Sequence, residues 1–330
     1  MGRHKPEIVV VTGASAGVGR AVVRQFARRG AWVGLVARGI DGLEGAKRDV
    51  EALGGKALVL PCDVADARAV EQAADEVERE FGPIDIWVNN AMTSVFSPFM
   101  EMEPGEFARV IEVTLLGYVH GTRAALRHMI PRNRGHIVQV SSALGFRSIP
   151  LQSAYCTAKH GILGFTESVR TELLHDGVDV TLTMVHLPAV DTPQFGWVKT
   201  RLPRRAQPVP PIFDPDVIAR AIYRAAHMRR RDVTVGFSAL KAIFGDKLAP
   251  RFADHVAART GWDGQMTDQP DPKDRPFNLW KPVPGDHGAR GSFGQRAKKH
   301  SPLTWLNLNR HWLVGGLALL GAGGLAARRL

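Results

Sequence analysis

Cysteine is scarce in this chain: Cys62 and Cys156 are the only two among 330 residues. Two cysteines cannot build the disulfide framework of a small secreted domain, and neither has partners at the spacing of a zinc site. Charged residues at the N-terminus lead directly into an apolar strand pattern, without the apolar segment of a signal peptide. We therefore expect a cytoplasmic location, no disulfide and no metal.

Acidic residues are absent after Asp286, although lysine and arginine continue almost to the last residue, and the formal net charge is +11. Two further basic clusters lie within residues 199–205 and 229–231. This excess of basic residues is typical of proteins that bind nucleic acid, an anionic membrane surface or a phosphorylated ligand. Since no nucleic-acid-binding motif accompanies the charge, we expect no nucleic-acid partner and favour a phosphorylated cofactor or a membrane surface.

A membrane span of ordinary length is also missing. The longest apolar stretch without a charge, residues 312–327, would rise about 24 Å as a helix, short of the roughly 30 Å hydrocarbon core. Trp305, Trp312 and the flanking arginines are typical of a membrane interface. We expect residues 303–330 to form a hydrophobic tail that associates with a membrane. The alternative is a helix that packs on the domain or on another subunit.

What the chain does have is a regular alternation of β-branched runs and helical patterns. Buried strands are predicted at residues 8–11, 32–37, 57–60, 84–88, 137–140 and 232–236, with helices between most of them. Strands that alternate with helices at this spacing predict an α/β fold, a Rossmann-type, doubly wound parallel sheet with helices on both faces. We expect a single domain over 6–262, a linker rich in proline, glycine and charge over 263–302, and the tail at 303–330.

A glycine-rich turn follows the first strand, with Gly13, Gly17 and Gly19 in the spacing G-x-x-x-G-x-G. Strand, glycine turn and helix in this order let the backbone approach a pyrophosphate, which the helix N-terminus attracts. The second strand ends at Arg38, with no acid beside it. An acid there would hold a ribose hydroxyl, whereas an arginine suits a 2′-phosphate, so NADP(H) is the predicted cofactor. The alternative is a surface arginine beside a loop.

A second polar group follows the predicted strand at 137–140. Tyr155 and Lys159 are four residues apart, on one face of a predicted helix, and Ser142 lies thirteen residues before Tyr155. An ammonium close to a phenol favours the phenolate. We therefore expect Lys159 to lower the pKa of Tyr155 and to make it a usable proton donor and acceptor near neutral pH.

Together these motifs resemble the short-chain dehydrogenase/reductase family over about residues 6–237. The residues that match are Thr12, Gly13, Gly17, Gly19, Asp63, Val64, Asn89, Asn90, Ala91, Ser142, Tyr155 and Lys159. The resemblance implies hydride transfer between a nicotinamide and a carbonyl or alcohol carbon. Tyr155 would be the general acid/base, Lys159 would hold the nicotinamide ribose, and Ser142 would donate to the substrate oxygen. The implied cofactor-binding residues are Gly13, Ser15, Gly17, Val18, Gly19, Arg38, Asp63, Val64, Asn90, Ala91, Tyr155, Lys159, Pro188, Val190 and Thr192.

The chain departs from the family pattern at three places. Thr114 stands where the family has an asparagine that helps to hold a water linked to the lysine. A threonine hydroxyl can also bind a water, so Thr114 is counted with Ser142, Tyr155 and Lys159 as a candidate catalytic residue. Ala189 replaces the glycine that usually follows the proline at 188, and Met92 replaces a glycine beside the cofactor.

Residues 188–213 contain six prolines and occupy the family's place for a mobile lid over the substrate. Phe195 and Trp197 within this segment favour an apolar substrate, although a lid that packs on its own core would look the same. We expect an NADP(H)-dependent oxidoreductase that acts on a small-molecule carbonyl or alcohol. The alternative is a non-catalytic NADP(H)-binding sensor or scaffold at a membrane. The resemblance also implies a homo-oligomer assembled through long helices.

Overall fold

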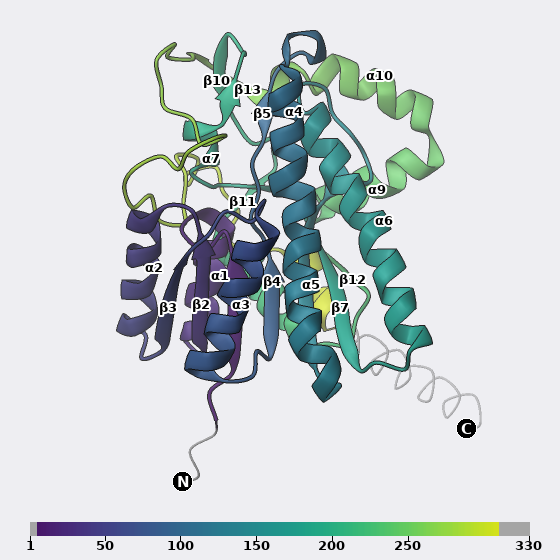
Figure 1. Cartoon of the computed structure of the whole chain (residues 1–330). Coiled ribbons are helices and arrows are strands. Elements are labelled where there is room, and N and C mark those ends of the chain that lie inside the picture. Colours follow the sequence, from purple (N-terminus) through teal and green to yellow (C-terminus); the bar gives the residue numbers. More distant parts are fainter. Residues whose placement is uncertain (1–4, 310–330) are drawn as a thin grey trace, which may run out of the picture.

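A sheet of seven parallel strands forms the centre of the computed structural model, which describes residues 5–309 (Figure 1). The strand order is β12-β7-β6-β4-β1-β2-β3. The strands are β1 (Ile8–Thr12), β2 (Trp32–Ala37), β3 (Lys56–Pro61), β4 (Ile86–Asn89), β6 (Gly135–Ser142), β7 (Val180–Leu187) and β12 (Asp232–Thr234). The chain runs outward from β1 to β3 and then crosses to β4, so the loops after β1 and β4 diverge and leave a crevice. The predicted fold class is confirmed.

Helices cover both faces of this sheet (Figure 1). On one face α1 packs against α2 and α8, and on the other α3 packs against α5 and α4 against α6. Their bounds are α1 (Gly17–Ala27), α2 (Ile40–Ala52), α3 (Ala67–Phe81), α4 (Pro104–Ile111), α5 (Gly117–Met129), α6 (Ser153–His175) and α8 (Pro215–Ala226). Because both faces are covered, β1 is buried along its whole length, which explains its uninterrupted β-branched sequence.

The segment predicted as one helix near 104–129 is interrupted. A π-helical turn, Glu112–Leu116, separates α4 from α5. Within this turn the Thr114 hydroxyl is hydrogen-bonded to both backbone groups of Thr93, donating to its carbonyl at 2.9 Å and accepting from its N–H at 3.0 Å. π-helical turns inside α-helices are frequent at functional sites. Here the turn ties the helix to the loop that follows β4.

The proline-rich segment at 188–213 is tied down by short strand pairs. β8 (Ala189–Val190) pairs with β11 (Ile212–Phe213), and β9 (Lys199–Thr200) pairs with β5 (Val95–Phe96). A small apolar cluster that includes Phe96, Leu151, Val198 and Leu202 lies beneath this segment. The segment thus has its own packed core, although the sequence suggested a largely irregular lid.

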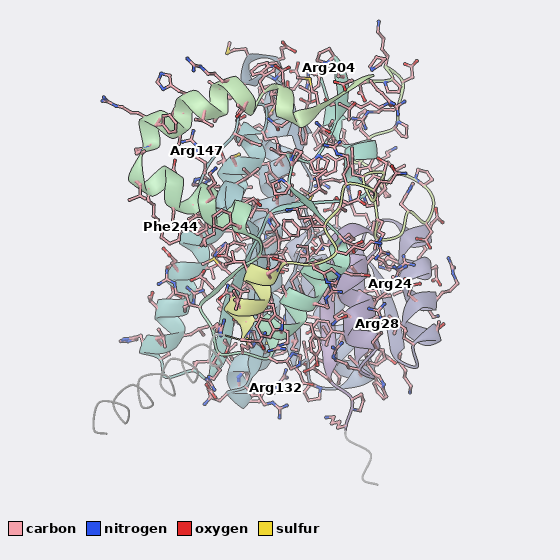
Figure 2. The ribbon with its side chains drawn as sticks, turned by 180° about the vertical axis from the view of Figure 1, so that it is seen from behind. Arg24, Arg28, Arg132, Arg147, Arg204 and Phe244 are labelled. Atoms are coloured by element: carbon pink, nitrogen blue, oxygen red, sulfur yellow. The ribbon has the colours of Figure 1, made fainter. Side chains whose placement is uncertain are left out.

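The predicted helical stretch at 238–262 consists of two helices, α9 (Phe237–Leu248) and α10 (Pro250–Thr260), which meet at Ala249. None of the residues of α10 is fully buried. Large apolar side chains are exposed on both helices, including Phe244 at 55%, Leu248 at 83% and Phe252 at 71% of their surface. Figure 2 shows the pair at the side of the molecule, with Phe244 on α9. The pair therefore has few buried residues, Ala239 and Ile243 on α9 and none on α10.

The predicted linker lies along the sheet domain. After β13 (Met266–Pro270), which pairs with β10 (Arg204–Ala206), residues 271–299 run across the carboxyl ends of the strands as irregular chain, and we call this segment the strap (Figure 1). Leu279 of the strap is completely buried. The strap is therefore held on the domain through Leu279, and the division of the chain at 262 and 302 stays a prediction.

Residues 303–309 of the predicted tail also lie on the domain. Helix α11 (Pro302–Leu308) packs against α8 and β12, with Thr304 and Leu308 buried. Residues 310–330, which carry the apolar stretch, lie outside the described residues. Within 5–309, no helix is long and apolar enough to cross a bilayer. Membrane association through the tail therefore stays a prediction.

Candidate active site

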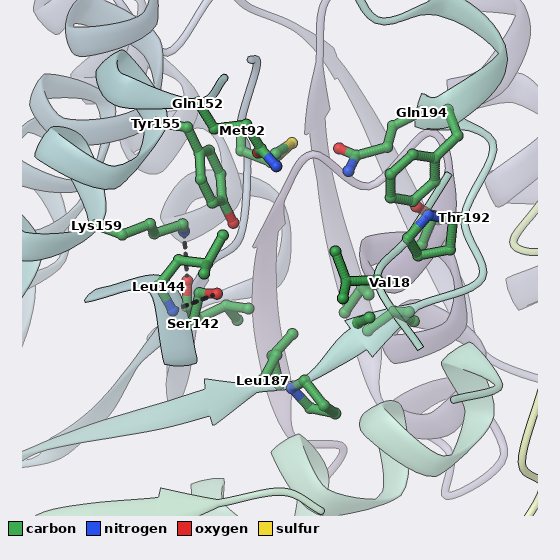
Figure 3. A pocket seen from close by; sticks show the side chains of 18 of the residues that line it. Val18, Met92, Ser142, Leu144, Gln152, Tyr155, Lys159, Leu187, Thr192 and Gln194 are labelled. Carbon is green, nitrogen blue, oxygen red and sulfur yellow. Dashed lines mark hydrogen bonds between the residues drawn. The ribbon is translucent and has the colours of Figure 1, made fainter. Parts of the chain in front are cut away.

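A cavity of about 760 Å³ opens at the carboxyl ends of the central strands. It is lined at one end by the glycine turn after β1 and at the other by the start of α6, with α9 and α10 beyond. In Figure 3, Ser142, Tyr155 and Lys159 lie on one side of this cavity, opposite Val18, Thr192 and Gln194. The cavity thus brings together the two sets of residues that the sequence placed far apart, at the position where α/β sheets bind ligands.

The glycine turn leaves no room for side chains. A Cβ on Gly13, which has a φ of +69°, would lie 2.9 Å from the Cα of Ala91. A Cβ on Gly19 would lie only 2.1 Å from the carbonyl oxygen of Gly13. The side-chain amide of Asn90 donates to the carbonyl of Thr12 at 3.0 Å and so ties β4 to this turn. The turn therefore exposes backbone to the cavity at the N-terminus of α1, as a pyrophosphate site requires.

Arg38 lies at the end of β2 and lines the cavity, as predicted. Its guanidinium is held by the strap: it donates to the carbonyls of Leu279 at 3.3 Å and Trp280 at 3.0 Å, and also to that of Asn278. The strap approaches the glycine turn as well, where the first amide of α1, that of Gly17, donates to the Gly288 carbonyl at 3.0 Å. The strap thus forms a wall of the predicted cofactor site.

Asp63 is one of the predicted cofactor-binding residues, and it lines the same end of the cavity. Its carboxylate accepts from the backbone N–H of Ala65 at 3.1 Å and forms an ion pair with Arg109 of α4. Arg109 also donates to the Leu279 carbonyl at 3.3 Å. Both arginines at this end, Arg38 and Arg109, therefore contact the same peptide of the strap.

Ser142 is the last residue of β6, and Tyr155 lies in the first turn of α6. The Ser142 oxygen accepts from the backbone N–H of Leu144 at 3.1 Å, which leaves its own hydrogen to donate. Burial raises the pKa of the Tyr155 phenol above its ordinary value, and a hydrogen bond with Ser142 offsets part of that rise. This is opposite to the lowering expected from Lys159, because desolvation of the phenolate outweighs any attraction to the ammonium.

Lys159 follows one turn later on α6 and is almost completely buried, with 2% of its surface exposed. Its ammonium donates to the carbonyl of Val140 at 2.8 Å and to the hydroxyl of Tyr118 at 3.2 Å, and it lies 5.6 Å from the centre of the Tyr155 ring. Burial lowers the pKa of Lys159 to about 7. Because burial disfavours the charged form, each oxygen that accepts a hydrogen bond from this ammonium helps to stabilise its charge.

Two of the predicted site residues do not line the cavity. Gly19 is buried against Gly13 and acts in packing. Thr114 is completely buried and bonded to Thr93. The other predicted residues all line it: Gly13, Ser15, Gly17, Val18, Arg38, Asp63, Val64, Asn90, Ala91, Ser142, Tyr155, Lys159, Pro188, Val190 and Thr192. Their roles toward a cofactor or substrate stay predictions.

The sequence did not identify several residues of this site. The strap contributes Asn278, Pro282 and His287 to the cavity wall, and no motif marks them because they lie more than a hundred residues from Tyr155. No motif indicated Tyr118 either, because it lies just outside the family's helix pattern, directly after Gly117. Among residues 5–309 no cluster of three or more His, Cys, Asp or Glu side chains is arranged to hold a metal ion.

Comparison with known proteins agrees with this geometry. A family model described as short chain dehydrogenase matches residues 7–201. The chain is 32% identical over 268 residues to the uncharacterized oxidoreductase YxnA of Bacillus subtilis, a match that covers 81% of this chain and 75% of that protein. The family-model match includes the glycine turn, Ser142, Tyr155 and Lys159.

Two solved structures share the fold. One is a metagenomic short-chain oxidoreductase in complex with NADP, with a TM-score of 0.58 and 30% identity over 69% of this chain and 96% of that one. The other is an alcohol dehydrogenase from the archaeon Thermococcus sibiricus complexed with 5-hydroxy-NADP, with a TM-score of 0.60 and 29% identity over 69% of this chain and 95% of that one. The resemblance seen in the motifs is confirmed, and the chain belongs to the short-chain dehydrogenase/reductase family.

Proposed function

We propose that this chain is an NADP(H)-dependent oxidoreductase that interconverts a carbonyl and an alcohol, with Tyr155 as general acid/base and an apolar substrate. The observation that carries the proposal is that Ser142, Tyr155 and Lys159 meet in the same cavity as the glycine turn. A dinucleotide at the turn and a substrate oxygen at Tyr155 would therefore share one partly enclosed space. That arrangement is what proximity catalysis needs.

The residues at the far end fit NADP(H). The side-chain-free turn and the start of α1 suit a pyrophosphate, and Arg38 offers a guanidinium where a 2′-phosphate is expected. The two solved relatives were determined with NADP and with 5-hydroxy-NADP. In this chain Arg38 already contacts strap carbonyls, so the strap and a 2′-phosphate would share its five N–H donors.

When bound, NADP(H) supplies or accepts the hydride, and the chain's own residues act on the substrate oxygen. In reduction Ser142 donates a hydrogen bond to the carbonyl oxygen, where negative charge develops, and Tyr155 gives it a proton. The raised pKa of Tyr155 keeps the phenol protonated in the free protein, which suits this direction. In oxidation Tyr155 takes the alcohol proton, and the charge of Lys159 favours the phenolate.

An apolar substrate is supported by the part of the cavity beyond Tyr155. The side chains there are mostly hydrocarbon and come from the loop after β6, from β5 and from α10. They include Phe96, Leu144, Ile149, Phe252 and Val256. Apolar walls of this extent favour apolar ligands, since each buried methylene contributes about 0.8 kcal/mol to binding.

The proposal is tested by a panel of carbonyl and alcohol compounds assayed with NADPH and NADP⁺ and again with NADH and NAD⁺. Turnover of apolar members with the phosphorylated cofactors is expected. Tyr155→Phe should reduce kcat by about 10³-fold, in the range of general acid–base catalysis, and leave NADPH binding within a few-fold. Tyr223→Phe, on α8, is the matched control and should keep full activity.

The outcomes separate the alternatives. Undiminished turnover in Tyr155→Phe would remove this residue from the mechanism. Tight NADPH binding without turnover of any compound in a broad panel would favour the non-catalytic sensor or scaffold. Preference for small, highly polar compounds would contradict the apolar substrate and leave the rest of the proposal in place.

A further inference from the structure

The hydroxyl of Tyr118 lies between Lys159 and strand β6, deep in the active-site wall. The Lys159 ammonium donates to the Tyr118 oxygen at 3.2 Å and to the Val140 carbonyl at 2.8 Å, and Tyr118 donates to the same carbonyl at 2.7 Å. The three groups form a closed triangle between α5, α6 and β6. Only 1% of the Tyr118 surface is exposed, so water cannot replace it freely.

The triangle fixes the orientation of the hydroxyl. A phenol has one hydrogen to give, and Tyr118 gives it to Val140. Its oxygen can then only accept from Lys159, so its lone pair faces the ammonium. The ammonium also lies 4.7 Å from the centre of the Tyr118 ring, within the range of a cation–π contact. Both the oxygen and the ring face of Tyr118 therefore stabilise the positive charge.

No carboxylate among residues 5–309 forms an ion pair with Lys159. The groups that face it are Tyr118 from α5, the Val140 carbonyl from β6 and Tyr155 from α6 itself. A buried ammonium without a counter-ion depends on neutral oxygens for its charge. Tyr118 supplies one of the two oxygens that contact it.

The Thr114 hydroxyl is bonded to Thr93 and is not one of the oxygens that stabilise the Lys159 ammonium. Its hydroxyl hydrogen is donated to the Thr93 carbonyl, and its oxygen accepts from the Thr93 N–H. Thr114 therefore shapes the π-helical turn, and a hydroxyl that accepts a hydrogen bond from Lys159 comes from four residues further along, at Tyr118. Gly117, between them, packs against Val64, where a Cβ would lie 2.7 Å from the nearest methyl group.

We propose that Tyr118 is a positioning residue of the active site, whose hydroxyl fixes the Lys159 ammonium beside Tyr155 and stabilises its charge. The inference rests on the proposed function, because it assigns Tyr118 a role through Lys159 and Tyr155. Removal of the hydroxyl takes away one of the two oxygen acceptors of the ammonium. The neutral amine is then favoured, so the pKa of Lys159 falls, and the Tyr155 phenolate loses a neighbouring cation and forms at higher pH.

The experiment is the pH dependence of kcat for alcohol oxidation in Tyr118→Phe, with Tyr223→Phe as the matched control. The midpoint of the rising limb should move up by about one pH unit, and kcat at pH 7.5 should fall about tenfold, as expected for one hydrogen bond to a charged group. The KM for cofactor should stay within about threefold. The Tm should change little, since the Phe ring keeps the packing, and Tyr223→Phe should match the parent throughout.

A lower kcat with an unmoved midpoint, in parallel with a lower Tm, would show a merely structural role and overturn the inference, and so would an unchanged profile. Thr114→Val provides a second arm that does not depend on the folding of Tyr118→Phe. Its midpoint is expected to stay in place even if its Tm falls, and a shifted midpoint in this variant would assign the role to Thr114. Persistent turnover in Tyr155→Phe would refute the proposed function itself, whereas an inactive Tyr155→Phe with an unmoved Tyr118→Phe would refute only this inference.

Discussion

The sheet domain and the C-terminal cover, residues 237–309, enclose one cavity by different physical means. In the sheet domain the site residues lie at strand ends, as Ser142 does at the end of β6, or on helices packed against the sheet, as Tyr155 and Lys159 do on α6. Close packing such as that of Gly19 on Gly13 holds the glycine turn in place. In the cover the chain is largely irregular or weakly packed, and α10 has no buried residue. The packed sheet domain holds the site residues in fixed positions, whereas the weakly packed cover mainly encloses the cavity.

The cover is attached at a few strong points. Leu279 packs with Val95, Val110 and Ala154 in a cluster that Tyr155 also borders. Asp286 of the strap forms an ion pair with Arg20 of α1 at 3.1 Å, and Arg20 is itself buried. The difference suggests a division of labour: the sheet domain carries the chemistry, and the cover decides what reaches it and how long it stays. The variants below test that division.

Arg38 lies in the sheet domain and donates hydrogen bonds to the strap, so its replacement should have the largest effect on cofactor binding. In Arg38→Ala the preference for NADPH over NADH, measured as a ratio of Kd values, should fall about 10- to 100-fold, because one charge-assisted contact to a phosphate is lost. The ratio isolates the phosphate contact, since a loosened strap would weaken both cofactors alike. Equal weakening of NADPH and NADH would mean that Arg38 serves the strap alone.

Replacement of Leu279 tests whether docking of the strap affects cofactor binding. Leu279→Ala removes a fully buried side chain and should destabilise the docked strap by about 2–4 kcal/mol. The expected result is an approximately tenfold higher KM for NADPH, with a smaller change in kcat, because its carbonyl no longer holds Arg38 and Arg109 in place. Leu248→Ala, at a side chain 83% exposed on α9, is the control and should behave like the parent. An unchanged KM in Leu279→Ala would make the strap a passive cover.

The sheet domain was predictable because its signals are local. The alternation of strands and helices along the chain was enough to predict the fold, because each strand or helix pattern lies within a short stretch of sequence. The residues of the glycine turn and the Tyr155–Lys159 pair were identifiable for the same reason, since strand ends and helical spacing bring them to one edge of the sheet.

The position of the strap and the direction of the Tyr155 pKa shift could not be predicted, because both depend on contacts between residues that are distant in the sequence. Nothing local indicates that residues 271–299 cross the cofactor site, because their composition is that of a linker and their attachment relies on Leu279 and on backbone carbonyls. The direction of the Tyr155 pKa was also missed. The spacing of Lys159 indicated attraction, but only the structure revealed that Lys159 is buried and that the Tyr155 phenol is largely desolvated. Burial is a property of the packed molecule, and no motif records it.

Phe252 of α10 should give the smallest effect, because this side chain can contribute to substrate binding only through apolar contact. It lines the cavity but keeps 71% of its surface exposed, so Phe252→Ser removes a limited contact area. We expect the KM for apolar substrates to rise about three- to fivefold, or less than 1 kcal/mol, with kcat unchanged. Since the residue touches no part of the chemistry, a fall in kcat would break the division between the two regions.

The matched control is Leu248→Ser, which makes a similar polar change on the exposed side of α9, away from the cavity lining. Small substrates provide an internal control, because they would not extend from Tyr155 to α10, and their KM should be unaffected in both variants. A rise in KM for large and small substrates alike would indicate that α10 acts by holding the lid segment. In that case the cover would shape the catalytic geometry as well as access to it.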